Sequence, residues 1–198
     1  GPNLVEPTGR LANTLGLPAL TGPFLLAALA YGIAGLIIFI WLKPDPLLIA
    51  KQIEHKVQEK TEAIVKRPIV LLGSFVMIIT QIIMVAIMTM TPIHMSHHGH
   101  SLSSVGLVIG LHIAAMYLPS LVTGALLDKF GRNVMIVAAS ITLFLSGIIA
   151  ALSSTNSLIG ITIALVLLGL GWNFGLISGT ALIIDGTTMV TRAKVQGM

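Results

Sequence analysis

The sequence predicts an all-α membrane protein, a helical bundle with five full spans. Of its 198 residues, 55% are hydrophobic and only 9% are charged, whereas a soluble domain carries roughly 25% charged residues. The hydrophobic residues lie in long runs, and crossing a bilayer as a helix takes about 20 such residues. Short alternating segments typical of membrane β-barrels do not occur. This composition excludes an ordinary soluble domain and a disordered chain.

The five apolar runs define the predicted spans. They cover residues 21–42, 69–91, 102–127, 134–153 and 158–184. Each is expected to be helical, because an isolated apolar run in lipid must satisfy its own backbone hydrogen bonds. The chain has no cysteine, which excludes disulfides and thiolate metal sites.

The basic residues predict the orientation of these spans. Loops 43–68, 128–133 and 185–198 carry six, two and two Lys or Arg residues, whereas 1–20, 92–101 and 154–157 carry one, none and none. Because basic loops stay in the cytoplasm, residues 1–20 are expected outside and loop 43–68 inside. The net charge of +4 is spread over these loops, so it forms no patch for a nucleic acid.

Loop 43–68 is the longest connection. Asp45 and Pro46 suit the start of a helix, and Ile49, Ile53 and Val57 follow at near-helical spacing. The pattern predicts an amphipathic helix, either solvated or lying on the membrane surface. The same helix could instead bridge two membrane bundles. A separate folded domain is excluded, because so short a segment buries too little core.

The turn after the third span carries a distinctive motif, Gly124-Ala-Leu-Leu-Asp128-Lys129-Phe-Gly131-Arg132-Asn. Gly124 would let a neighbouring helix come close, and Gly131 suits a positive φ in a tight turn. Asp128 and Arg132 could pair across the turn. We expect the loop formed by these residues to act as a gate, through Asp128 and Arg132. The alternative is a generic basic turn without a role in gating.

This motif resembles the signature loop of the Major Facilitator Superfamily, secondary transporters built from two six-helix halves. Asn133 replaces a basic residue of the signature, which suits the weaker second copy between the eighth and ninth spans. Loop 43–68 resembles the family's central linker. Gly1-Pro2-Asn3 resembles the end of the antiporter motif in the fifth span, and Gln196-Gly197 the entry to the eleventh. Other runs, such as Gly171-Trp-Asn-Phe174, are similar to a bacterial permease subgroup.

The resemblance implies a division of the chain. Residues 1–20 would hold the end of the fifth span and an external segment, 21–42 the sixth span, and 43–68 the cytoplasmic linker between the halves. Residues 69–184 would form spans seven to ten, and 185–198 a cytoplasmic tail leading to the eleventh span. The N-terminal half of the same protein would be a partner, together with the lipid bilayer of a bacterial cell membrane.

Polar residues within the spans are candidates for a transport path, because polar groups are costly in lipid and tend to face a bundle or cavity. These candidates are Gln81, His112, Met116, Trp172 and Asn173. An imidazole titrates near neutral pH, so His112 is expected to carry a proton, with Gln81 and Asn173 as its expected partners. Interhelical hydrogen bonding is the alternative role. The glycines of the run 158–184, including Gly169 and Gly175, favour close helix packing.

The external loop contains a histidine-rich tract. Its members are His94, His97, His98 and His100, and such tracts can bind Zn²⁺, Cu²⁺ or Ni²⁺. An exposed loop without metal is the favoured interpretation, and a divalent-metal exporter is an alternative function. A membrane di-iron oxidase is disfavoured, because such enzymes need several histidine boxes on the cytoplasmic side.

The resemblance implies a secondary active transporter rather than an enzyme. The expected activity is proton-coupled efflux of a small molecule by alternating access, with no cofactor and with protons as the coupling ion. The efflux direction depends on the Gly1-Pro2 motif alone. The nucleotide-binding pattern Gly-x-x-x-x-Gly-Lys-Ser/Thr is absent from the sequence, so nothing in it supports ATP-driven transport.

Overall fold

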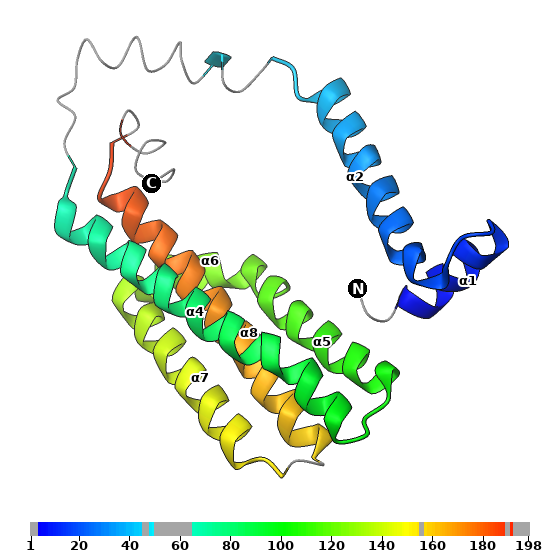
Figure 1. The fold of residues 1–198 in the computed structure, drawn as a ribbon. Coiled ribbons are helices and arrows are strands. Elements are labelled where there is room, and N and C mark those ends of the chain that lie inside the picture. The colour runs from blue at the N-terminus through cyan, green and yellow to red at the C-terminus, as the bar shows by residue number, and fades with distance from the viewer. Residues whose placement is uncertain (1–3, 45–47, 50–64, 155–156, 189–190, 192–198) are drawn as a thin grey trace. The chain divides into compact units, whose positions relative to one another are not determined.

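The computed structural model describes residues 4–44, 48–49, 65–154, 157–188 and 191 (Figure 1). The chain divides into two compact units, Gly1–Ala63 and Ile64–Met198. The predicted linker helix falls on residues 45–64, of which only Leu48 and Ile49 are described, and both are helical. The motifs at Gly1-Pro2-Asn3 and Gln196-Gly197 also lie outside the described residues.

The first unit holds a short helix and one membrane span. Helix α1 (Val5–Thr14) is followed by the 3-10 turn η2 (Ala19–Thr21) and by α2 (Gly22–Trp41), which confirms the predicted first span. Gly22 lies against the backbone of Thr8, so α1 packs at the start of α2. The apolar side chains of α2 are exposed, as the surface of a span requires.

The second unit is a bundle arranged around its last helix. It contains α4 (Arg67–His97), α5 (Leu102–Tyr117), α6 (Ser120–Phe130), α7 (Arg132–Leu152) and α8 (Leu158–Asp185). Helix α8 packs against α4, α5 and α7 (Figure 1). Half of its apolar stretch is buried, against 11% for α4 and 22% for α7. The described residues therefore contain four spanning helices, and a fifth span when α5 and α6 are taken together, which confirms the all-α, five-span prediction.

Glycines make the close packing around α8 possible. A Cβ added to Gly169 would lie 2.6 Å from the backbone oxygen of His112 on α5. One added to Gly171 would lie 2.7 Å from Leu143 on α7, and Gly175 lies against α4. Three neighbours thus approach α8 where it has no side chain, which confirms the packing role predicted for these glycines.

Helix α4 is longer than the sequence predicted. The span was expected to end at residue 91 and to be followed by an external loop, but the helix continues through Pro92 to His97. Proline removes one backbone donor, a loss that a helix within a membrane bundle can tolerate. The prediction of a loop over residues 92–97 was therefore wrong.

The third predicted span is bent. Helices α5 and α6 meet at an angle of 41° across a short break. Pro119 lies in this break and precedes the first residue of α6. Because proline has no N–H and its ring clashes with the preceding turn, the carbonyl groups just before it lose their usual helical donors. The bend thus creates backbone acceptors in the middle of the membrane bundle.

Candidate functional site

Helix α8 bonds to two different neighbours through adjacent residues, to α4 through Trp172 and to the bend between α5 and α6 through Asn173. The indole Nε1–H of Trp172 donates to the side-chain oxygen of Gln81 on α4 at 2.9 Å. Tyr117, at the end of α5, meets the Trp172 ring edge-on with 6.0 Å between the ring centroids. Gln81 lines an open groove of about 700 Å³ whose other described lining residues are apolar. The Gln81–Trp172 pair therefore places an amide at the mouth of a groove along α4 and α8.

Asn173 is bonded to the bend of the third span. Its Nδ2 donates to the backbone oxygen of Met116 and to the hydroxyl of Ser120, both at 2.8 Å. Its Oδ1 accepts from the hydroxyl of Thr123 at 2.6 Å. The side chain is 2% exposed, so one buried amide joins α8 to both sides of the break between α5 and α6.

His112 has a different partner from those expected. Its Nδ1–H donates to the backbone oxygen of Leu165 on α8 at 2.7 Å, and the side chain is 1% exposed. Its Nε2 is buried without a hydrogen-bond partner among the described residues. The prediction that His112 pairs with Gln81 or Asn173 was wrong, because those amides are bonded to Trp172 and to the bend. The side chain of Met116 was predicted to lie on the transport path, but the residue takes part in this site through its backbone oxygen, which accepts from Asn173.

Three residues of this site were missed by the sequence reasoning. They are Tyr117, Ser120 and Thr123. Hydroxyl residues are common in spanning helices and usually bond to their own backbone, so Ser120 and Thr123 did not stand out. The available signal was Pro119, since a proline inside a span indicates freed backbone groups that need side-chain partners.

The turn after α6 is held by a pair that the sequence did not suggest. Arg132 Nε donates to Asp185 at the end of α8 at 2.8 Å, with a second contact from Nη2 at 3.4 Å. The prediction that Arg132 pairs with Asp128 was therefore wrong, because Arg132 bonds instead to the carboxylate of Asp185, the last residue of α8. Gly131 has a φ of 85°, which confirms the predicted positive φ.

The other residues of the turn motif have looser surroundings. A Cβ on Gly124 would meet nothing within 4 Å among the described residues, so the predicted close helix approach at Gly124 does not occur there. Asp128 is exposed. Lys129 lies over the ring of Phe130, with Nζ 5.3 Å from the centroid. Arg132 and Asp185 therefore make the defined contact of this turn.

The histidine tract is only partly clustered. His94 and His97 lie in the last turn of α4, and His98 caps it. The rings of His94 and His98 are 4.4 Å apart at their centroids. Among the described residues, which include all four histidines of the tract, no group of three His, Cys, Asp or Glu side chains could hold a metal ion. The tract thus does not form a four-histidine site.

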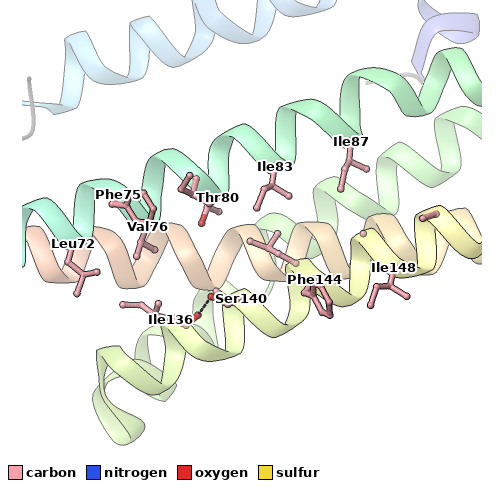
Figure 2. Close-up of a pocket in the computed structure, with 15 residues that line it drawn as sticks. Leu72, Phe75, Val76, Thr80, Ile83, Ile87, Ile136, Ser140, Phe144 and Ile148 are labelled. Carbon is pink, nitrogen blue, oxygen red and sulfur yellow. Dashed lines mark hydrogen bonds between the residues drawn. The ribbon is translucent and has the colours of Figure 1, made fainter.

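A second groove, of about 760 Å³, lies between α4 and α7 (Figure 2). Its described lining is apolar except for Thr80 and Ser140. The Ser140 hydroxyl donates to the Ile136 backbone oxygen of its own helix at 2.9 Å (Figure 2). This groove therefore offers an apolar packing surface and little polar chemistry for recognising a solute.

Spanning helices, a buried polar site at mid-span and a short charged turn together define a multi-pass integral membrane protein. Residues 8–198 match the family model described as Major Facilitator Superfamily. The chain belongs to this family, a family of membrane transporters rather than enzymes, as its turn motif indicated. No solved structure matches it.

Bacterial relatives support this assignment. The chain is 56% identical to the "Uncharacterized MFS-type transporter YdeG" and 54% identical to the "Uncharacterized MFS-type transporter YddS", both of Bacillus subtilis (strain 168). It is 31% identical to the "Riboflavin transporter RfnT" of Brucella anthropi. Each alignment covers 100% of this chain but only 47–48% of the relative. The chain therefore spans about half the length of the curated relatives that it matches.

Proposed function

We propose that the chain is part of a secondary active transporter that carries a small molecule by alternating access. The observation that carries this proposal is the polar site of α8 at mid-span, where Trp172 holds Gln81 and Asn173 holds the bend. Polar groups at this depth are costly and tend to mark substrate pathways. Transporters of this type bind substrate near the bilayer midplane, between two halves. The chain would supply one wall of that cavity, and the N-terminal half of the protein would supply the other.

In this proposal the substrate contacts three residues, Gln81, Trp172 and Tyr117. The Gln81 side-chain oxygen accepts a hydrogen bond from Trp172. The Gln81 amide nitrogen has no hydrogen-bond partner among the described residues. This nitrogen is thus available to donate to an acceptor on a substrate. Tyr117 is 60% exposed, so it can present an aromatic surface beside Trp172. Because one relative is named a riboflavin transporter, an aromatic solute of flavin size is the first candidate substrate.

His112 carries the proton in this proposal. Its Nε2 has no protein partner among the described residues, so it remains able to accept a proton. Since the side chain is buried between α5 and α8, protonation requires these helices to separate. Protonation would thereby be linked to the movement of α5 past Gly169. Coupling to the proton gradient is expected to drive efflux.

The test uses the full-length protein in proteoliposomes. Riboflavin and a panel of non-aromatic solutes would be loaded, and their movement would be measured with and without an imposed pH gradient. Gln81→Ala is expected to lower the transport rate about two- to tenfold, because one substrate hydrogen bond to an uncharged group is lost. Thr162→Val is the matched control, since its hydroxyl bonds only to Leu158 of its own helix.

Two results would contradict the proposal. Transport that does not respond to the pH gradient would exclude proton coupling. An unchanged rate in Gln81→Ala, for a solute that the protein does transport, would remove Gln81 from the substrate path.

A further inference from the structure

The external end of α4 carries three potential metal ligands on one face. Met90, His94 and His98 follow each other at intervals of four residues, so their side chains lie one above the other. All three line one groove of about 620 Å³, formed with the ends of α7 and α8. The described residues of that groove include no Lys or Arg that would repel a cation.

The hydrogen bonding of His98 prepares it for coordination. Its Nδ1 lies 2.8 Å from the backbone oxygen of His94. A carbonyl can only accept, so Nδ1 carries the proton and Nε2 keeps its lone pair. Histidines that bind metals commonly donate their second ring nitrogen to a backbone carbonyl in this manner. This contact fixes both the tautomer and the orientation of the ring.

The spacing of the two rings suits one shared ion. Their centroids are 4.4 Å apart, and two imidazoles that bind one metal at ~2.0 Å per nitrogen can have centroids up to ~6 Å apart. Imidazole binds Zn²⁺, Ni²⁺ and copper, whereas a thioether sulfur selects Cu⁺. The combination of two imidazoles with Met90 therefore favours copper over zinc.

We propose that Met90, His94 and His98 form an external binding site for a copper ion. The site is separate from the proposed transport path, because His94 follows Gln81 by thirteen residues, or ~20 Å along the helix at 1.5 Å per residue. His97 also lines this groove, whereas His100 lies beyond the end of α4 and is not among the described residues that line it. The site therefore does not depend on the proposed substrate or on proton coupling.

The experiment measures metal binding to the full-length protein, purified without a polyhistidine tag. Cu⁺ affinity would be measured anaerobically by competition with bathocuproine disulfonate, and Zn²⁺ affinity in parallel. One Cu⁺ per chain is expected, and His94→Gln or His98→Gln should each weaken its binding about 10- to 100-fold. Met90→Leu should weaken Cu⁺ binding about tenfold or more and leave Zn²⁺ binding within about twofold. His100→Gln, the matched control, should bind Cu⁺ like the unchanged protein.

Several results would overturn the proposal. These are the absence of Cu⁺ binding, affinities that His94→Gln and His98→Gln leave unchanged, a loss in His100→Gln equal to that in His98→Gln, and a Cu⁺ affinity independent of Met90. Each variant is compared only after it elutes as one species in size-exclusion chromatography with the helical content of the unchanged protein. Replacing Met90 with Gln supplies a second variant at that position should leucine impair folding.

Discussion

The substitution Asn173→Leu tests the buried polar site most sharply. Leucine has a similar size but removes all three hydrogen bonds that join Asn173 to Met116, Ser120 and Thr123. Interhelical hydrogen bonds in membranes contribute on average ~0.6 kcal/mol each, so their loss costs ~2 kcal/mol. The backbone oxygen of Met116 then stays buried beside the bend without its side-chain donor, which adds ~1 kcal/mol. We expect a loss of about 2–3 kcal/mol in the free energy of unfolding.

The assay is reversible unfolding of the full-length protein in mixed micelles with increasing SDS, followed by circular dichroism. Thr123→Val should cost ~0.6 kcal/mol, and the double variant should lose less than the sum of the two changes, because both remove the same bond. Thr162→Val, whose hydroxyl bonds only to its own helix, should change stability by less than ~0.5 kcal/mol. Additive losses for Asn173→Leu and Thr123→Val, or an Asn173→Leu variant as stable as the unchanged protein, would refute the reasoning.

Four further predictions follow from the packing, the turn between α6 and α7 and the buried histidine. Gly169→Ala should destabilise the protein by ~1–3 kcal/mol in the same assay, because the new Cβ meets backbone of α5, whereas Gly147→Ala meets nothing within 4 Å and should not destabilise it. Arg132→Gln and Asp185→Asn should lower transport to a similar extent with normal membrane insertion, because each breaks the same ion pair. Unequal losses would show that the two residues affect transport independently of this pair. Asp128→Asn should also lower transport if the turn gates the protein, and an unchanged rate would make Asp128 a passive surface residue. His112→Gln should flatten the pH dependence of transport, because glutamine keeps a hydrogen-bonding side chain but cannot take up a proton, and an unaltered profile would assign His112 to packing.

The spans were predictable because lipid imposes one rule on all of them. A run of about 20 apolar residues must form a helix, and α2, α7 and α8 therefore begin and end within a few residues of the predicted limits. The end of α4 was not predictable in this way. His94 and His97 are polar, and polarity indicates where a helix leaves the lipid but not where its backbone stops being helical.

The partners within the site were harder to predict than its members. Gln81, His112, Trp172 and Asn173 stood out as polar residues in apolar spans, and all four make hydrogen bonds between helices. Which residue each one meets depends on how α8 is rotated against its neighbours. That rotation is set by glycines such as Gly169 and Gly171, whose contacts follow from the packing of three helices at once.

The turn between α6 and α7 shows the same limit. Asp128 and Arg132 are four residues apart, so a local pair was the natural expectation. Arg132 instead reaches Asp185, 53 residues later in the sequence. The pairing depends on α7 and α8 lying side by side, which no local pattern contains. Gly131, in contrast, was predicted correctly, because a positive φ is a local property of the turn.

The central claim is that the polar site of α4 and α8 faces a cavity that opens alternately to the two sides of the membrane. It is tested most directly by thiol labelling of Gln81→Cys in a full-length, otherwise cysteine-free protein, with a membrane-impermeant reagent applied to intact cells or to inverted vesicles. Ile141→Cys on α7, where the side chain is exposed and is expected to face lipid, serves as the control that should not react. The account predicts that Cys at position 81 reacts from both sides and that a transported solute slows both reactions. Labelling from neither side, at the rate of the Ile141→Cys control, would contradict it.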